Sequence, residues 1–289
     1  MRPRVTIGIC ARNAQYILSS AVESILQQDF PHELMEIIFV DDGSEDKTKK
    51  IMEDYTSKIN IASRVYSGEW RGLGKARNTV VDNAQGDYLI WVDADEILEK
   101  NFVRTQFNLI EKHPEAGIAS AKVWILPREN LVLTLDLIPP IVEYSIQDWQ
   151  KSSKLPGTGG ATFRVEAARQ VGGFDESIEG AGEDIDIAYR MKQSGWSIVR
   201  GEAIFYEAHG QLSTWKALWK RYLNHGIQSR HDTSSVHYSI YRINPLASFV
   251  AGFRYAVLGY RTTKMKAAIL VPFHFTFKMT AWFCGFTRK

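Results

Sequence analysis

The chain has 289 residues, of which 45% are hydrophobic and 24% charged, an ordinary balance for a globular protein with a sizeable core. This length allows one large domain and a smaller appendage. The two cysteines, Cys10 and Cys284, lie near opposite ends of the sequence, which excludes a disulfide framework and favours a reducing compartment. The apolar run Val5–Cys10 is too short for a signal peptide, so we expect a protein that stays in the cytoplasm or faces it.

The formal net charge of +2 conceals an uneven distribution of charge. No acidic residue follows Asp232, and residues 233–289 carry eight basic residues: Arg242, Arg254, Arg261, Lys264, Lys266, Lys278, Arg288 and Lys289. Subtraction from the totals of 35 basic and 33 acidic residues leaves 27 basic and 33 acidic residues in 1–232, a net charge of −6 there. Charge segregated in this way predicts a separate partner for the tail.

The first half of the chain alternates strand-like and helix-like segments. Strands are expected at Val5–Cys10, Glu36–Val40, Ser63–Tyr66 and Asp87–Val92. Helices are expected over 17–26, over the polar segment that follows Ser44 and ends at about Ser57, and over Leu73–Asn83. Uninterrupted apolar runs such as Glu36–Val40 are typical of parallel strands that are buried on both faces. The alternation therefore predicts the α/β class, with a doubly wound, Rossmann-like sheet that binds its ligands beyond the carboxyl ends of its strands.

The second half is less regular. Residues 126–156 contain four prolines and show no clear period, so we expect a long excursion over the site there. A glycine-rich stretch at 157–160 follows, and helical spacing returns from about Glu183 to Ser194. The last expected strand, Ala203–Ala208, ends just before His209.

Two aspartates, Asp93 and Asp95, directly follow the strand expected at Asp87–Val92. Residues two apart in a strand lie on the same side, so both carboxylates can face one ion. Hard oxygen ligands of this kind suit Mg²⁺ or Mn²⁺ that bridges a diphosphate. A solvated acidic turn is the alternative for the pair alone, but its place after a buried strand favours a metal site.

A second pair of carboxylates, Asp41 and Asp42, follows the strand Glu36–Val40. A carboxylate at a strand end can accept hydrogen bonds from a base N–H group or from a ribose hydroxyl. Gly43 permits a tight turn after the pair, and capping of the next helix is the simpler role for Ser44.

The helix expected at Leu73–Asn83 begins with glycines and cations. Gly72 and Gly74 flank its first residue, and Lys75 and Arg77 lie in or near its first turn. Backbone N–H groups at a helix start, with a cation nearby, form a reasonable diphosphate site. Because glycine before a helix is common, this pattern is informative only beside the others.

These motifs occur together and in this order, and in them the chain resembles glycosyltransferase family 2, whose members are inverting enzymes with the GT-A fold. The resemblance covers about residues 4–230 and rests on these stretches: Val5–Asn13, Val40–Ser44, Gly74–Asn78, Trp91–Glu96, Gly159–Arg164, Val171–Glu176, Gly182–Ile187, Arg190 and Gly195–Trp196. One stretch departs from the family pattern, because Arg71-Gly-Leu precedes Gly74 where the family often has Asn-x-Gly.

The resemblance implies a nucleotide-diphosphate sugar as donor, a UDP-, GDP- or dTDP-sugar, and a divalent metal, Mg²⁺ or Mn²⁺, as cofactor. The donor-binding residues that it implies are Ala11, Arg12, Asn13, Asp41, Asp42, Lys75, Arg77 and Asp93. Among them, Asp42 is expected to read the base. The implied metal ligands are Asp93, Asp95 and His209, of which Asp95 is the surest.

The resemblance also implies that Asp184 is the catalytic base, and elementary chemistry agrees. Inversion at the anomeric carbon is a single displacement, so one carboxylate must take the proton of the acceptor hydroxyl during attack. Asp184 stands at the start of a predicted helix, whose dipole favours the ionised form. Gly160 and Glu183 are expected on the acceptor side, with orientation of the base as a second role for Glu183. Asp186 is expected to pair with Arg190 one turn further on.

The C-terminal part of the chain predicts contact with a membrane. Ser213–Leu223 combines tryptophans with basic residues as interfacial helices do, although packing on the catalytic domain explains it equally well. Two largely apolar runs follow, Pro245–Tyr260 and Ala267–Phe286, and the second approaches the ~20 residues that span a bilayer. Lys278 interrupts it at a cost of ~2.5–3.5 kcal/mol on insertion. We therefore expect a shallow hairpin or interfacial helices.

Two domains are expected, a GT-A catalytic domain at 1–210 and an amphipathic, partly hydrophobic basic region at 211–289. Each basic residue near anionic headgroups contributes ~1 kcal/mol, so the tail can hold the protein on the cytoplasmic face of a membrane as a peripheral or monotopic protein. Nucleic acid is not expected as a partner, because the tail charges are spread among long hydrophobic runs.

The function expected from the sequence is sugar transfer to a lipid-linked acceptor or to a cell-surface glycan. The alternatives are a sugar-1-phosphate nucleotidylyltransferase and a non-catalytic, membrane-associated binding module. The first normally shows Gly-x-Gly-Thr-Arg after its first strand, where this chain has Ala11–Asn13. The second is disfavoured by the presence of Asp93, Asp95 and Asp184.

Overall fold

The computed structural model describes residues 2–125, 130–146, 154–178, 182–208, 214–228 and 245–288. The chain divides into two compact units. Met1–Val123 and Gln150–Ala208 form what we call the sheet unit, and Trp124–Trp149 and His209–Lys289 form the helical unit.

The sheet unit is built on eight strands in the spatial order β3-β2-β1-β4-β7-β6-β8-β5. The strands are β1 (Val5–Ala11), β2 (Met35–Asp42), β3 (Ala62–Gly68), β4 (Tyr88–Trp91), β5 (Glu96–Leu98), β6 (Ala116–Trp124), β7 (Thr162–Arg164) and β8 (Ser197–Glu207). β1 is parallel to β2 and β4, and β2 is parallel to β3, whereas β7 is antiparallel to β4 and β6, and β5 to β8. The predicted α/β class is confirmed, with the predicted parallel strands forming one half of a mixed sheet.

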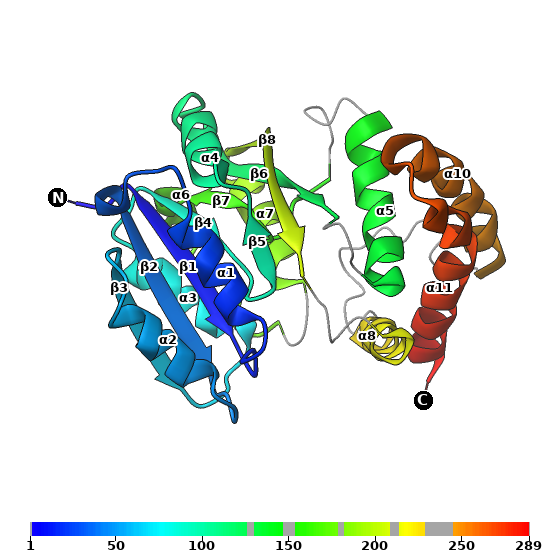
Figure 1. Ribbon diagram of the computed structural model, residues 1–289, viewed down its shortest axis with the longest axis horizontal. Coiled ribbons are helices and arrows are strands. Elements are labelled where there is room, and N and C mark those ends of the chain that lie inside the picture. The colour runs from blue at the N-terminus through cyan, green and yellow to red at the C-terminus, as the bar shows by residue number, and fades with distance from the viewer. Residues whose placement is uncertain are drawn as a thin grey trace. The chain divides into compact units, whose positions relative to one another are not determined.

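Helices cover both faces of this sheet (Figure 1). They are α1 (Leu18–Leu26), η1 (His32–Leu34), α2 (Thr48–Thr56), α3 (Leu73–Asn83), α4 (Phe102–Glu111), α6 (Val165–Gln170) and α7 (Glu183–Gln193). α3, α6 and α7 share one buried core with the sheet, in which Trp91 meets Phe174 edge to face at 5.4 Å between ring centres. α1 and α2 lie on the other face. Because both faces are covered, β2 is buried from Met35 to Asp41, which explains its uninterrupted apolar sequence.

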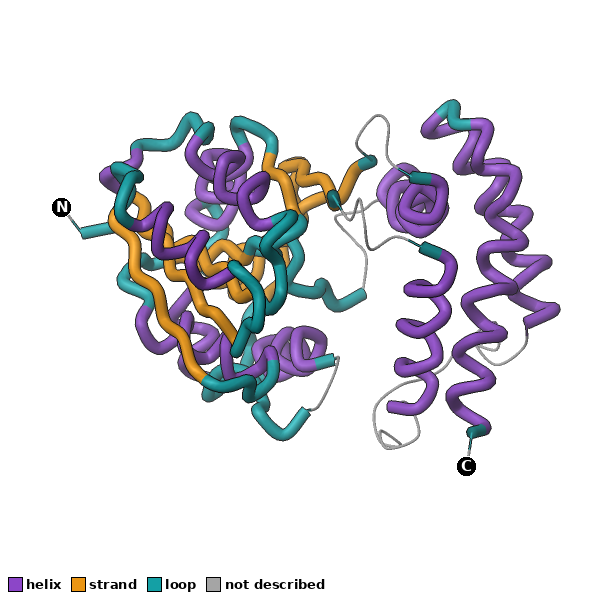
Figure 2. Tube along the Cα trace, turned by 60° about the horizontal axis from the view of Figure 1, so that its bottom comes forward, coloured by secondary structure: helices purple, strands orange, loops and turns teal. Residues whose placement is uncertain are grey.

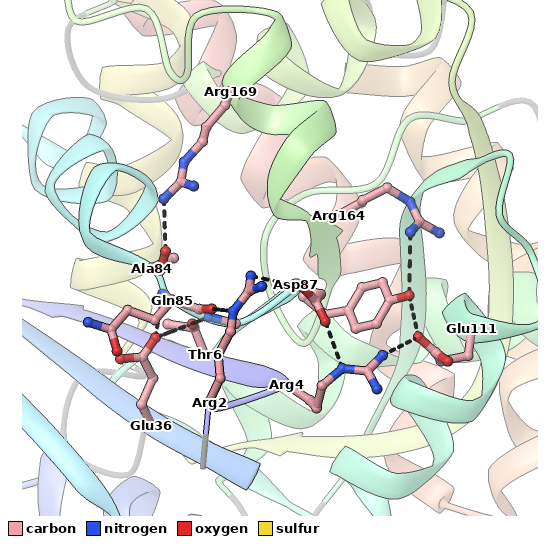
Figure 3. Close-up of polar contacts among 12 residues, drawn as sticks. Arg2, Arg4, Thr6, Glu36, Ala84, Gln85, Asp87, Glu111, Arg164 and Arg169 are labelled. Carbon is pink, nitrogen blue, oxygen red and sulfur yellow. Dashed lines mark hydrogen bonds and ion pairs between the residues drawn. The ribbon is translucent and has the colours of Figure 1, made fainter.

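The edge at which β1 and β4 begin is held by polar side chains (Figure 3). The buried carboxylate of Glu36 accepts hydrogen bonds from Oγ1 of Thr6 and from the backbone N of Gln85, each at 2.6 Å. Asp87 accepts one from Nε of Arg4, also at 2.6 Å. These groups satisfy one another across neighbouring strands, so the polar side chains at this edge have a structural role.

The helical unit consists of α5 (Leu131–Ile146), α8 (Trp215–Gln228), α10 (Pro245–Thr263), η3 (Lys266–Leu270) and α11 (Val271–Thr287), with α10 and α11 side by side (Figure 2). α5 corrects the expectation of an irregular excursion over 126–156, of which 126–129 and 147–153 lie outside the described residues. Its sequence is apolar on nearly all sides, so no helical period is visible. Pro139 and Pro140 lie inside it and argue against a helix on propensity alone. Burial of its side chains outweighs that cost.

Helices α8 and α11 approach each other closely at two glycines. A Cβ atom on Gly226 would lie 2.0 Å from the carbonyl oxygen of Trp282, and one on Gly285 would lie 2.0 Å from that of Leu223. Any larger side chain at either position would push the two helices apart. Small residues of this kind let helix backbones come into contact.

Asp136 of α5, a partly buried carboxylate, lies near basic side chains of α8 and α11. Nζ of Lys278 on α11 lies 2.6 Å from its Oδ1, and the guanidinium of Arg221 on α8 lies 3.6 Å from its Oδ2. The ammonium of Lys278 also lies 4.9 Å from the ring centre of Tyr222. His274 is fully buried, with Nε2 3.8 Å from the same carboxylate. The lysine that interrupts the apolar tail run is therefore neutralised inside the helical unit.

Candidate active site

The ends of β1 and β2 lie side by side and carry the first group of predicted donor-binding residues. Ala11 is paired in register with Asp41. Asn13 has a left-handed backbone (φ 53°), donates from its backbone N to Oγ of Ser44 at 3.0 Å, and accepts at Oδ1 from the backbone N of Glu45 at 2.9 Å. These bonds fasten the two strand-end loops to each other. The alternative role of Ser44 as a helix cap is wrong, because α2 begins four residues further on.

The two aspartates at the end of β2 have different partners. Asp41 is buried, and its Oδ2 accepts a hydrogen bond from the backbone N of Ser44 at 3.3 Å. Its Oδ1 has no hydrogen-bond partner within the described residues. Asp42 accepts a bond from the backbone N of Arg71 at 3.0 Å, which ties this loop to the one before α3. A buried oxygen without a partner can accept a hydrogen bond from a ligand, because burial without one is costly.

Trp70 is part of this region, although its sequence context did not predict it. The guanidinium carbon of Arg12 lies 4.7 Å from the centre of its ring, and Trp70 as a residue is 63% exposed. Gly43 has a left-handed backbone (φ 71°), and a Cβ atom there would lie 2.5 Å from the backbone N of Trp70. Gly43 is thus needed for the tight turn, as predicted, and the turn leaves an aromatic surface beside the strand-end aspartates.

The two cations of α3 lie in contrasting surroundings. Lys75 is partly exposed, with Nζ 3.6 Å from a carboxylate oxygen of Glu176. Arg77 is 3% exposed, forms an ion pair with the buried Glu183, and has Nη2 3.5 Å from Oδ1 of Asp93. Arg77 therefore joins α3 to the end of β4 and to the first turn of α7. Its placement suits the positioning of protein carboxylates, whereas Lys75 is the cation that solvent reaches.

Negative charge is concentrated at the end of β4. Removal from bulk water raises the pKa of Asp93, and the charges of Asp95, Glu207 and Asp184 raise it further, while Arg77 lowers it. Glu207 was not predicted as a site residue. It faces the start of β5 in the pairing of β5 with β8, which only the fold reveals.

The predicted metal ligands are only partly described. The backbone N of Ala208 donates to the carbonyl oxygen of Asp95 at 2.7 Å, so the chain that leaves β8 passes beside this residue. The next residue, His209, lies outside the described residues. In the described ranges no group of three or more His, Cys, Asp or Glu side chains is gathered closely enough to hold a metal ion. The donors present, Asp93 and Asp95, are carboxylates in a region of excess negative charge, and this chemistry fits Mg²⁺ or Mn²⁺.

Glu96 has a place in the site that its sequence context did not predict. Its Oε2 accepts hydrogen bonds from the backbone N of Asp93 at 3.1 Å and from that of Gly160 at 3.2 Å. Burial, followed by the charge of Asp93, raises the pKa of Glu96 well above its ordinary value. Gly160, whose carbonyl accepts from Nε2 of Gln106 at 3.1 Å, is thereby held against the Asp-x-Asp turn. The sequence feature that could have indicated this role is the position of Glu96 directly after Asp95.

Asp184 lies in the first turn of α7, next to the glycine-rich stretch. Its Oδ1 accepts from the backbone N of Ile185 at 2.8 Å. A Cβ atom on Gly157 would lie 2.7 Å from its Oδ2, so glycine allows the backbone to approach this carboxylate. Asp186 accepts from Nε of Arg190 at 2.7 Å, which confirms the predicted pair. In this turn Glu183 and Asp186 are each paired with an arginine, whereas Asp184 accepts from a backbone N–H group.

Solved structures share this architecture. The mannosyltransferase PcManGT from Pyrobaculum calidifontis, in complex with GDP-Man and Mn²⁺, matches with a TM-score of 0.67 and 18% identity over 97% of this chain and 86% of that chain. TarS of Staphylococcus aureus, also solved with UDP-GlcNAc, matches with a TM-score of 0.58 and 15% identity over 98% of this chain and 90% of that chain. At such identities the likeness concerns the fold, and it confirms the predicted GT-A class.

The family follows from the sequence itself. The family model described as "Glycosyl transferase family 2" matches residues 6–171, more than half of the chain. The chain belongs to glycosyl transferase family 2, as its motifs predicted.

Two curated relatives agree with this membership. TarS, a poly(ribitol-phosphate) beta-N-acetylglucosaminyltransferase of Staphylococcus aureus, is 31% identical over 101 residues, 35% of this chain and 18% of the relative. Beta-monoglucosyldiacylglycerol synthase of Trichormus variabilis is 24% identical over 229 residues, 75% of this chain and 47% of the relative. The chain thus spans less than half the length of either relative.

Proposed function

We propose that this chain transfers a sugar, with inversion, from a nucleotide-diphosphate sugar to a hydroxyl acceptor, and that Asp184 is the base. One observation carries the proposal: Arg77 contacts both Asp93 at the end of β4 and Glu183, the residue that directly precedes Asp184 in the first turn of α7. A carboxylate from α7 therefore stands beside the strand end at which a diphosphate would be held. In that place it can take the proton of an acceptor hydroxyl as the hydroxyl attacks.

The nucleoside is proposed to lie at the ends of β1 and β2, against Ala11–Asn13, Asp41 and Asp42. The unpartnered Oδ1 of Asp41 supports this placement, as does the exposed ring of Trp70. Lys75 is proposed to contact the diphosphate because solvent reaches it. The complexes of TarS with UDP-GlcNAc and of PcManGT with GDP-Man support a UDP- or GDP-sugar, and a dTDP-sugar is the third candidate.

A divalent metal is proposed at Asp95 and Asp93, with His209 as a further ligand. The Mn²⁺ bound in the PcManGT complex supports a metal of this kind, Mn²⁺ or Mg²⁺. When bound, it would neutralise charge on the leaving diphosphate. Arg77 would keep Asp93 in place, and Glu96 would hold the turn between the two aspartates through the backbone of Asp93.

The acceptor is proposed to be lipid-linked or a glycan at a membrane, with Gly160 and Glu183 on its side of the site. One relative is named a beta-monoglucosyldiacylglycerol synthase, which supports a lipid acceptor. The basic residues of 233–289 other than the buried Lys278, in a segment without any acidic residue, support attachment to an anionic, cytoplasmic membrane face. We place the chemistry within 1–210 and the attachment within 211–289.

A panel of UDP-, GDP- and dTDP-sugars, assayed with Mn²⁺ or Mg²⁺ by release of the nucleoside diphosphate, tests this function. Asp184→Asn should still bind nucleoside diphosphate but lose transfer by ~10²–10⁴-fold. Asp186→Asn is the matched control, because it makes the same change in the same turn at a residue paired with Arg190, and it should retain most of the activity.

Two results would contradict the proposal. Equal activity of the two variants would show that Asp184 is not the base. Failure of the unmodified chain to turn over any donor would leave the non-catalytic, membrane-associated module as the better reading. Nucleotidyl transfer, the other alternative, is disfavoured by membership of the family.

A further inference from the structure

Helix α10 carries an exposed apolar stripe. Five residues, which we call the outer stripe, form it: Leu246, Val250, Phe253, Val257 and Tyr260, each between 51% and 71% exposed. A helix turns once in 3.6 residues, so spacings of three and four keep all five on one face. With a rise of ~1.5 Å per residue, the stripe runs for roughly 21 Å. The ring of Phe249 on α10 lies 5.1 Å from that of Phe253 and 5.4 Å from that of Phe273 on α11, measured between ring centres, so Phe273, which is 63% exposed, adjoins the stripe. Ile269 of η3, just before α11, is 74% exposed.

Another side of α10 is packed inside the helical unit. Gly252, Ala256 and Gly259 are buried there. A Cβ atom on Gly252 would lie 2.4 Å from Cα of Pro272 on α11, and one on Gly259 would lie 2.5 Å from Cγ2 of Ile138 on α5. At ~100° per residue, the centre of the outer stripe lies roughly 110° around α10 from these buried residues, so the stripe lies on a flank of the helix that α5 and α11 leave exposed.

Basic residues border the outer stripe. Arg254 and Arg261 are exposed and each directly follows a stripe residue, so both lie along the same edge of it. Lys264 and Lys266, also exposed, follow the end of α10. A shallow hollow here is lined by Phe253, Arg254, Val257 and Leu258. A cation beside apolar walls matches a phospholipid, in which an anionic headgroup adjoins acyl chains.

By composition alone, a different segment would be chosen for the membrane. Among the described helices, Lys266–Thr287 is the one long and apolar enough to cross a bilayer, with 22 residues and a mean hydropathy of 1.2. Yet its Lys278 is buried against Asp136 of α5 at 2.6 Å. Withdrawal of α11 alone into lipid would break this ion pair and leave an uncompensated charge on both sides, which is strongly unfavourable.

We propose that the outer stripe, with Ile269 and Phe273, is the surface that enters an anionic phospholipid bilayer, with α10 lying along the membrane plane and α11 remaining inside the helical unit. A second copy of the chain is a poorer occupant. A symmetric interface would bury the stripes of both copies and gather their bordering arginines at one interface, for which 233–289 supplies no acidic residue. The biological purpose of the surface rests on the proposed function, since it would bring the site to a membrane-bound acceptor.

The double variant Val250→Glu/Val257→Glu tests the proposal in full-length protein, by flotation with vesicles of phosphatidylcholine and phosphatidylglycerol. Binding scales with the apolar area that enters the membrane, so we expect the partition coefficient to fall by about tenfold or more. The control variant Ser57→Glu/Asn60→Glu adds the same charge at exposed positions of the sheet unit. It should change the partition coefficient by about twofold at most. Ile269→Ser, which adds no charge, should give a smaller loss in the same direction. Circular dichroism checks that each variant is folded.

Several outcomes would overturn the proposal. The first is an equal partition coefficient for the stripe variant and the control variant. The second is absence of vesicle binding by the unmodified chain. The third is resistance of the bound chain to extraction by alkaline carbonate, which would mean that α11 spans the bilayer. A dimer in light scattering that the stripe variant converts to a monomer would assign the stripe to a second copy. Donor turnover with a water-soluble acceptor should be the same in the stripe variant and the unmodified chain. Absence of turnover in both would refute the proposed function and leave the vesicle result standing.

Discussion

Arg77 is a buried charged residue of the sheet unit whose replacement we expect to be costly. Its side chain is 4% exposed, it forms an ion pair with the equally buried Glu183, and it lies 3.5 Å from Asp93. Its guanidinium carbon lies 5.8 Å from the ring centre of Trp91 and 5.6 Å from that of Phe174. Methionine is of similar length and uncharged, so Arg77→Met would keep most of the packing and leave Glu183 buried without a counter-ion.

The expected loss follows from this burial. Removal of one partner of a buried ion pair costs ~3–5 kcal/mol, mostly because the other charge stays buried. We therefore expect Arg77→Met to lower the free energy of unfolding by about 3–5 kcal/mol. Arg104→Met is the matched control, because Arg104 is exposed and pairs with Asp29 at 3.1 Å, and loss of a surface pair costs about 1 kcal/mol or less.

Urea denaturation with hydrogen–deuterium exchange of the α3 and β4 peptides measures this loss within the sheet unit. The double variant Arg77→Met/Glu183→Met removes both charges, so it should be more stable than Arg77→Met alone. Turnover of Arg77→Met should also fall, because Asp93 loses a positioning contact. The reasoning is refuted if Arg77→Met loses no more stability than the Arg104→Met control, or if the second substitution adds its full cost to the first.

Three further predictions concern other parts of the chain. Asp95→Asn should keep the fold and lose metal-stimulated turnover, and normal activity of that variant in EDTA would contradict the metal assignment. Gly160 has a φ of 58°, and a Cβ atom there would lie 2.4 Å from Cδ1 of Phe205, so Gly160→Ala should lower the free energy of unfolding by about 1–3 kcal/mol in thermal denaturation. Burial and a neighbouring ammonium lower the pKa of His274 from 6.5 to about 3, so the unfolded chain takes up a proton that the folded chain does not. The free energy of unfolding should therefore fall by about 2 kcal/mol from pH 7 to pH 5, while Asp136, whose pKa is lowered, stays ionised. A similar fall in His274→Phe would contradict this assignment.

The parallel half of the sheet could be predicted from sequence because its signals are local. A strand covered on both faces needs an uninterrupted apolar run, and β1, β2 and β4 each have one that ends in polar residues. α3 occupies its predicted bounds, Leu73–Asn83, because its start after Gly72 is also local. The antiparallel strands β5, β6 and β7 and helix α4 were not predicted. β5 and β7 have three residues each, too few for a period to be visible.

Helix α5 was missed for a different reason. Its prolines and its lack of a polar face argue against a helix on sequence alone, yet residues Leu131–Ile146 are helical in the structure. Side chains such as Leu135 and Ile138 are fully buried, and that burial is a tertiary effect which no local pattern reports.

The sequence by itself determined the family, the α/β class and the order of the polar groups at the strand ends, because these depend on short motifs and on apolar runs. Only the tertiary structure decided how the charged groups are paired. Arg77 and Glu183 are 106 positions apart, and Lys278 and Asp136 are 142 apart. No rule based on sequence spacing applies over such separations, because the energy of a charge depends on its burial and on the distance to its partner in space. For that reason Arg77, a predicted donor-binding residue, lies buried between two carboxylates, and the lysine in the apolar helix α11 is neutralised inside the helical unit.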